Sequence, residues 1–430
     1  MKKLLRALKK AKSISDWKIN VTETESCELF YVGKKLETNR ATETEDYAVT
    51  VYIDKDGKRG FASFTYYPYM DEGEIDEEIK KALFAASFTY NDFFALPKSK
   101  GKPVGKSNSN LKRGSFNEII GKVAEAVFKA DKYEDGSLSA TEIFLYRVNR
   151  RVINSQGVDV ASISYRGNIE TIPSWKRKGE EVELYDMISF ETFDKKEITS
   201  KVKEALLQCK ARSKAKKLNA KRLPSDVNVI IEDEEVEQVF SFFARDLSYS
   251  SKYQHMNFSE IGDKVQGEEV EGDKLNLRLC PFYQGAIASR FVDEDGVVLK
   301  EIDLIEDGVA KANHGSYQYG YYLKVEEPTG VLPIIVVKEG ETGIEKMKEK
   351  PYLRCVKFSG MQLDPHSGFI GGEVRLGFYF DGKKEVPVTG FSISGDFTAI
   401  KGKIIYSKQT TTLPSYHGPK YLLLPDMKVI

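Results

Sequence analysis

The segment PYLRCVKFSGMQLDPHSGFIGGEVRLGFYFDGKKEVPVTGFSISGDF, residues Pro351–Phe397, decides the fold class of the second half of this chain. Apolar residues alternate with others at Val374, Leu376 and Phe378, which is the period of a strand with one buried face. Asp381-Gly382 follows and favours the left-handed backbone of a tight hairpin turn. Glycine recurs every few residues, too often for helices and well suited to bulges. The segment therefore predicts a meander of short strands.

Length and charge limit the classes of protein to which the chain can belong. Its 430 residues are too many for one hydrophobic core, so two or three domains are expected. The 65 basic and 65 acidic residues leave a formal net charge of zero. A protein that binds DNA directly normally carries a basic excess, because its lysines and arginines displace counterions from the phosphates. The sequence therefore predicts no direct nucleic-acid partner.

Cysteine spacing and the absence of long apolar runs indicate the compartment. Cys27, Cys209, Cys280 and Cys355 lie far apart without a CxxC pair, which argues against a disulfide framework and a zinc ribbon. The first residues, MKKLLRALKKAK, are basic but lack the apolar run of a secretory signal. No stretch reaches the roughly 18 apolar residues of a membrane span. We expect a cytoplasmic protein with free thiols and no membrane partner.

Strand and helix patterns mix in the first half of the chain. Helices are expected at residues 2–10, 71–86, 117–130 and 195–217, and strands at 27–32, 47–54, 60–66 and within 139–172. The segment Ala95–Arg113 is polar, basic and rich in Gly, Pro and Ser, which predicts an exposed loop. Together these patterns predict one sheet covered by helices.

The charged segment Lys214–Ser225 lacks periodicity and contains Pro224, which makes it the predicted domain boundary. Beyond it one helix is expected, Glu234–Leu247, followed by strands with hairpins at Asp293–Gly296 and Asp381-Gly382. The predicted fold class is α+β. Residues 1–222 form an N-terminal sheet-and-helix layer domain, and residues 223–430 form a mainly β C-terminal domain.

Several short motifs occur in a fixed order along the chain. They are Asn154-Ser155-Gln156-Gly157, SEIGDKV at Ser259–Val265, LIEDG at Leu304–Gly308, and a C-terminal series of Phe358-Ser359-Gly360, Ser367-Gly368-Phe369, Asp381-Gly382-Lys383, Pro387-Val388 and Ser394-Gly395-Asp396. In this order they resemble the TldD/PmbA family, first described as modulators of DNA gyrase and now treated as metallopeptidase-like. The resemblance implies cytoplasmic proteolysis of small or unfolded peptides, in which a zinc-bearing TldD subunit pairs with a TldE subunit that lacks zinc.

The family's zinc motif is missing from this chain. TldD-type members carry H-E-x-x-x-H on a helix, and a cysteine near the C-terminus completes the site, which leaves an open position for water. Here the sequence SFFARD occupies that position, so Ser241, Phe242 and Asp246 mark the missing motif, and no cysteine follows Cys355. The resemblance therefore implies a TldE/PmbA-like chain with no catalytic residue, metal or cofactor of its own.

Two other sets of residues contain groups that can bind a metal. The four histidines lie in separate segments, and His314 and His366 are the first candidates for a rebuilt site because turns can converge on a cleft. The segment Asp131–Glu142 fits the EF-hand frame except at Tyr133, where a ligand is missing. A strand pattern follows that segment instead of the exiting helix, so it predicts a helix end and turn.

The leading hypothesis is a metal-free subunit that holds an extended peptide while a zinc-bearing TldD-type partner supplies the activated water. Strand addition to an exposed sheet edge would hold a peptide without specific pockets, and the Gly-rich strand Phe369–Phe380 is the candidate edge. One alternative is a non-enzymatic peptide-binding protein that forms a homodimer with itself. Another is a stand-alone peptidase with an unrecognised site.

Overall fold

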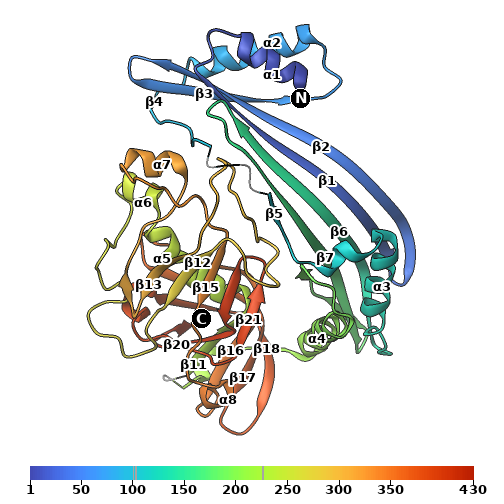
Figure 1. The fold of residues 1–430 in the computed structure, drawn as a ribbon. Coiled ribbons are helices and arrows are strands. Elements are labelled where there is room, and N and C mark those ends of the chain that lie inside the picture. Colours follow the sequence, from blue (N-terminus) through green and yellow to red (C-terminus); the bar gives the residue numbers. More distant parts are fainter. Residues whose placement is uncertain (100, 102–103, 225–226) are drawn as a thin grey trace.

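Figure 1 shows the computed structural model, which describes residues 1–99, 101, 104–224 and 227–430. The first part of the chain forms one sheet of nine strands with helices packed at both ends, so the predicted α+β layer is confirmed. Its elements are α1 (Lys2–Lys10), β1 (Asp16–Val32), β2 (Lys35–Lys55), β3 (Lys58–Tyr66), α2 (Glu72–Ala86), β4 (Asn91–Asp92), β5 (Val104–Lys106), a 3-10 turn (Asn110–Arg113), α3 (Phe116–Phe128), β6 (Gly136–Asn154), β7 (Asp159–Arg177), β8 (Glu180–Glu183), β9 (Asp186–Phe190) and α4 (Lys195–Lys214).

Long antiparallel strands give the N-terminal sheet its extended, twisted shape (Figure 1). The strands run in the order β4-β3-β2-β1-β6-β7-β5, and β8 and β9 also pair with β7. Asp56 and Gly57 have positive φ angles of 52° and 74° in the turn between β2 and β3. One buried cluster lies where α1 and α2 cover the sheet, and a second lies under α3 and α4 at its far end.

The motif Asn154–Gly157 forms the turn between β6 and β7 and ties several segments together. The Asn154 side chain accepts the backbone N–H groups of Gln156 and Val158, each at 3.0 Å, and donates to the carbonyl oxygen of Pro97 at 2.9 Å. Ser155 and Gln156 donate to a carboxylate oxygen of Asp16. The motif therefore fixes the start of β1 and the segment after β4.

The second part of the chain contains two sheets, so the predicted mainly β part is confirmed. One has nine strands on the path β10-β18-β17-β16-β11-β23-β20 with β19 and β24 alongside, and the other has six in the order β14-β13-β12-β15-β22-β21. The elements are β10 (Lys216–Lys217), a 3-10 turn (Ala220–Arg222), β11 (Asn228–Glu232), α5 (Glu234–Asp246), α6 (Tyr249–Tyr253), β12 (Leu277–Cys280), β13 (Ile302–Glu306), β14 (Val309–Ala310), α7 (Tyr317–Tyr322), β15 (Ile334–Val337), α8 (Ile344–Met347), β16 (Tyr352–Leu363), β17 (Phe369–Phe380), β18 (Glu385–Thr389), β19 (Phe391–Asp396), α9 (Phe397–Ile400), β20 (Ile405–Tyr406), β21 (Thr410–Leu413), β22 (Tyr416–Pro419), β23 (Tyr421–Leu424) and β24 (Lys428–Val429).

Two expectations are wrong. Strand β17 is not a free edge, because β16 pairs with it on one side while β18 and β19 share its other side. The segment Ala95–Arg113 is not exposed throughout, because Leu96, Ser109 and Leu111 are buried against the sheet and α4 region. Residues 100 and 102–103 of that segment lie outside the described residues. The boundary between residues 222 and 223 stays a prediction, although β10 already pairs with β18.

Three further expectations concern the state of the cysteines, the segment after Asp131 and membrane-spanning helices. Cys27, Cys209, Cys280 and Cys355 are free and buried, as predicted. The segment from Asp131 ends a helix and leads into β6, so the predicted helix end and strand are confirmed. Among the described helices, none combines the length and apolarity needed to cross a membrane.

Arg59 generates a stability prediction. Its guanidinium group is 1% exposed and donates to Asp16 at 2.8 Å and to Asp54 at 2.7 Å. Arg59→Met removes both ion pairs and leaves the buried Asp16 carboxylate without a counter-charge, although Ser155 and Gln156 still donate hydrogen bonds to it. We expect it to lower the free energy of unfolding of the N-terminal part by about 3–5 kcal/mol, measured by chemical denaturation and circular dichroism.

Lys81→Met is the matched control. Lys81 pairs with Glu77 and Glu78, but its side chain is 61% exposed. Solvent screens such pairs, so the control should change the free energy of unfolding by less than about 1 kcal/mol. Equal effects of the two substitutions would contradict the role assigned to Arg59.

Candidate functional site

The segment Ser241–Asp246, where the sequence predicts that a zinc motif is missing, lies on α5, which follows β11 and packs between the two C-terminal sheets. The inner face of the helix is fully apolar, with Val236, Val239, Phe240 and Phe243 each at most 2% exposed. Apolar residues at i, i+3, i+4 and i+7 produce this face, because that spacing returns to one side of a helix. The apolar spacing in the sequence therefore determines which face of α5 packs against the sheets.

Aromatic rings fill the space next to the motif position. The ring of Phe242 lies 4.8 Å from that of Phe397, 5.4 Å from that of Phe243 and 6.3 Å from that of Phe258. Ser241 is half-buried beside Phe242 on the same helix. Rings at these separations gain dispersion and edge-to-face contact. We call Phe242, Phe243, Phe258 and Phe397 the aromatic cluster.

Asp246, the last residue of α5, has a structural role. Its carboxylate is 6% exposed and accepts the backbone N–H of Phe258 at 2.5 Å. This hydrogen bond holds the loop after α6 against the end of α5, which places the Phe258 ring over Phe242. Asp246 therefore positions one member of the aromatic cluster.

His314 contacts the same helix. Its Nε2 lies 2.7 Å from the carbonyl oxygen of Ala244, so this nitrogen donates and satisfies one of the free carbonyl groups at the helix end. Its Nδ1 is buried without a hydrogen-bond partner among the described residues. Burial lowers the pKa of the imidazole, which keeps it neutral. His314 acts as a cap of α5.

His366 lies beside Phe258, one member of the aromatic cluster. It is exposed in the turn between β16 and β17, with its ring 6.2 Å from that of Phe258. His314 and His366 thus both border the α5 region but do not meet in one cluster. In the part of the chain that the structure describes, no three His, Cys, Asp or Glu side chains are arranged to hold a metal.

Cys355 lies under α5 on β16 and is fully buried. Burial raises the pKa of its thiol, and the carboxylates of Glu235 and Glu232 add to the effect. A thiol becomes a metal ligand or nucleophile as its thiolate. The surroundings of Cys355 therefore favour an inert thiol.

An unpaired sheet edge runs beside α5. Strand β11 pairs with β16 only from Tyr352 to Cys355, while β17 pairs with it as far as Leu363. Across the described residues, no strand covers the outer side of Val356–Leu363. This stretch contains the motif Phe358-Ser359-Gly360, and register shifts mark bulges along it. We call Val356–Leu363 the open edge.

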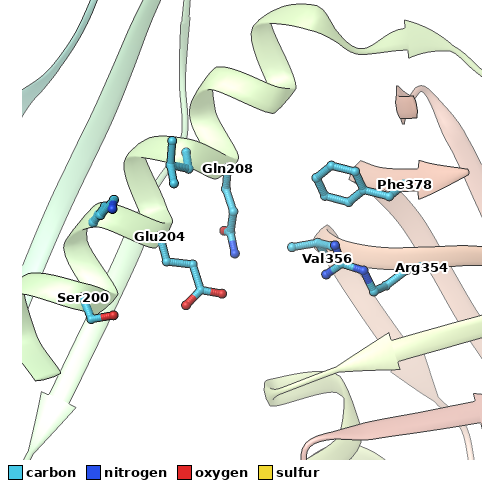
Figure 2. A pocket seen from close by; sticks show the side chains of 8 residues that line it. Ser200, Glu204, Gln208, Arg354, Val356 and Phe378 are labelled. Atoms are coloured by element: carbon cyan, nitrogen blue, oxygen red, sulfur yellow. The ribbon is translucent and has the colours of Figure 1, made fainter. Parts of the chain in front are cut away.

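A pocket of about 400 Å³ lies between α4 and the face of the C-terminal sheet. In Figure 2, Ser200, Glu204 and Gln208 project from one side of α4, and Arg354, Val356 and Phe378 face them from β16 and β17. Ser200, Glu204 and Gln208 share one side of the helix because they are spaced four residues apart. The pocket therefore joins residues about 150 positions apart, which sequence spacing alone could not bring together.

Charged side chains next to this pocket link the two parts of the chain. Arg354 pairs with Glu232 at 2.9 Å, and its guanidinium lies 4.6 Å from the centre of the Phe378 ring. Lys357, at the start of the open edge, pairs with Asp186 of β9 at 2.7 Å. Burial raises the pKa of Glu235, in the first turn of α5, to about 7. The Lys357–Asp186 pair ties the open edge to the N-terminal sheet, whereas the Arg354–Glu232 pair lies within the C-terminal sheet.

The structure also explains two of the sequence motifs. Backbone hydrogen bonds join Gly262 to Ala310 and Val265 to Gly308, so SEIGDKV lies against LIEDG. Asp307 and Gly308 have positive φ angles of 48° and 79° in the turn between β13 and β14. These two motifs therefore pack together as one structural unit.

Comparison with known protein families identifies the C-terminal part of the chain. Residues 224–430 match the model of the PmbA/TldA metallopeptidase C-terminal domain. No curated protein sequence matches the chain.

Solved structures resemble the chain over its full length. TldE from Thermococcus kodakarensis is 15% identical with a TM-score of 0.79, and the match covers 99% of each chain. A proposed modulator of a DNA gyrase from Thermotoga maritima is 18% identical with a TM-score of 0.76, covering 100% of this chain and 99% of that one. One from Bacteroides thetaiotaomicron is 15% identical with a TM-score of 0.79, covering 100% and 98%. Residues 224–430 therefore match the PmbA/TldA metallopeptidase C-terminal domain, and the whole chain has the fold of these three structures.

Proposed function

We propose that this chain is a metal-free, TldE-like subunit that holds an extended peptide while a zinc-bearing TldD-type partner cleaves it. The peptide would be small or unfolded, and the pair would act in the cytoplasm, where four buried thiols stay reduced. The partner would supply the zinc and the activated water. This chain would supply surface that binds and orients the peptide.

One observation supports the proposal: the aromatic cluster packs around the part of α5, Ser241–Asp246, where the sequence comparison above expects a zinc-bearing relative to present its ligands. Phe242 and Phe243 contact Phe397, and Phe258 covers Phe242. Rings packed this closely leave no opening for a metal-bound water, which a catalytic zinc site needs. The full-length fold similarity to a TldE supports the same role.

The open edge is the proposed peptide-binding site. It replaces the edge first expected at Phe369–Phe380, which lies in the interior of the sheet. An extended peptide would pair with the main chain of Val356–Leu363 by strand addition, a mode that needs few specific side chains. The ion pair between Lys357 and Asp186 holds one end of this edge in place.

Metal content and cleavage of a fluorescently labelled unfolded protein such as β-casein test the proposal. We expect no stoichiometric zinc in the purified chain, no cleavage by the chain alone, and cleavage with a co-purified TldD-type partner. Zinc would be measured by elemental analysis. Zinc near one per chain, with chelator-sensitive cleavage by this chain alone, would falsify the proposal.

Gly360→Glu tests the open edge. A side chain at Gly360 meets no atom within 4 Å, so the substitution should not disturb the fold, but it adds bulk and charge beside the edge. We expect peptide affinity to fall about tenfold or more, measured by fluorescence anisotropy.

Gly121→Glu is the matched control, because its added side chain also meets no atom within 4 Å and it lies on α3. It should leave peptide affinity unchanged. If both glycine variants bind peptide with the affinity of the wild type, the open edge is not the peptide-binding site.

The capping role of His314 predicts a pH dependence of stability. Burial lowers the pKa of the folded imidazole, so the unfolded chain binds a proton that the folded chain does not. Stability is therefore complete above the unfolded pKa of about 6.5 and is lost as the pH falls below it.

His314→Gln should flatten this loss, because glutamine can still donate to Ala244 but does not titrate. The free energy of unfolding of the wild type should fall by at most about 1.4 kcal/mol per pH unit through this group. The measurement is the change in Tm of each protein between pH 7.5 and 5.5. A wild-type Tm that falls no more steeply than that of the variant would show that His314 is not buried in its neutral form.

A further inference from the structure

Two cavities share a wall along the line where the two parts of the chain meet. One has a volume of about 520 Å³ and the other about 560 Å³. Tyr317, Glu326 and Pro328 line both of them, so the cavities are neighbours along one elongated depression. We call this depression the seam groove. It is separate from the open edge and from the pocket of Figure 2.

One end of the seam groove is aliphatic. Val158, which precedes β7, and Val160 of β7 form one wall, and Val297, Val298 and Ile302 from the C-terminal part form the other. Val298 is 39% exposed, so its side chain is available to a ligand. Surfaces of this kind bind apolar side chains by removing them from water.

The other end is aromatic. Phe93 follows β4, and Tyr253, Tyr321 and Tyr322 come from α6 and α7. Phe93 is 38% exposed and Tyr321 is 37% exposed, and their rings lie 6.1 Å apart. The hydroxyl groups of Tyr253 and Tyr322 donate to Asp92, which leaves ring surface to face the groove. Aromatic ring surface of this kind favours apolar and aromatic side chains.

The walls of the groove are held in place before any ligand binds. Lys18 of β1 pairs with Asp295 at 2.6 Å across the seam. A side chain at Gly296 would stand 2.6 Å from Val158, so the two parts are in close contact there. The Asp293 carboxylate accepts the backbone N–H groups of Asp295, Val297 and Val331. Because its walls are already fixed, the groove loses little conformational entropy when it binds a ligand.

The charges along the groove leave lysines without partners. Lys98, Lys300 and Lys324 line it, are exposed, and form no ion pair with any other described residue. Most of the carboxylates that line it are engaged: Asp92 pairs with Lys58, Glu301 approaches Arg278 at 3.7 Å, and Glu327 has a partner, which leaves Glu326. The unpaired charge of the groove is therefore mainly positive.

We propose that the seam groove binds an extended peptide segment that combines aliphatic or aromatic side chains with acidic ones. The apolar side chains would fill the valine and tyrosine ends, and the carboxylates would meet Lys98, Lys300 and Lys324. The inference rests on the proposed peptide-holding function and adds a preference for acidic, apolar sequences. Because the unpaired charges of the groove are mainly positive, it should attract acidic peptides and repel basic ones.

Two labelled peptides test this preference. The first alternates leucine or phenylalanine with glutamate, and its twin carries lysine in place of every glutamate. Fluorescence anisotropy with the full chain at low salt should show the acidic peptide binding about tenfold or more tightly than the twin, and added salt should reduce the difference.

Variants locate the site. Lys300→Glu and Lys324→Glu should each weaken binding of the acidic peptide by about threefold to tenfold, and Val298→Asp should weaken it by a similar factor. Lys80→Glu is the matched control, because Lys80 is an exposed lysine on α2 away from the groove, and it should leave affinity unchanged. Circular dichroism would show that each variant is folded.

The outcomes separate the two proposals. Equal affinity for the acidic peptide and its twin, or equal effects of Lys80→Glu and the groove variants, would overturn the groove inference. If the acidic peptide binds and only Gly360→Glu weakens it, the open edge holds the peptide and the groove does not. If no peptide binds to the chain alone or with a TldD-type partner, the proposed function itself fails.

Discussion

The apolar packing of α5 between two sheets is the constraint on which the C-terminal part depends. Strands β11 and β16 approach the helix from one sheet and β15 from the other, and the largest buried cluster of the chain surrounds it. Each large side chain buried there contributes roughly 1.5–3 kcal/mol. Phe242 and Phe243 extend this packing, because both of their rings contact that of Phe397.

Polar contacts, in contrast, join the two parts of the chain. Lys18 with Asp295 and Lys357 with Asp186 bridge them at separate points, and Tyr322 donates to the backbone of Asp92. Buried ion pairs contribute less to net stability than apolar packing but fix relative position more strictly. The open edge and the seam groove both lie next to such pairs, which explains why their walls are fixed.

Local features of the fold were predictable from the sequence, and those that need distant partners were not. Alternating residues and Asp-Gly turns located the hairpins, and the apolar spacing of α5 located its helix, because each depends on neighbours a few residues apart. The central place of β17 was missed, because it depends on β16, β18 and β19 lying on both sides. The positions of Ser241, Phe242 and Asp246 were predicted on one helix, but the contacts of Phe242 with Phe258 and Phe397 depend on chain folding.

Pairing across long distances also sets the order in which the chain can fold. Strand β11 lies between β16 and β23, and Val229 pairs with Leu424 near the end of the chain. The β1–β2 and β6–β7 hairpins form from neighbouring segments, whereas the sheet behind α5 stays incomplete until β23 has been synthesised. Contacts between distant segments form slowly, and unpaired strands expose apolar surface in the meantime. During synthesis the sheet against which α5 packs therefore cannot be completed until β23 has been made.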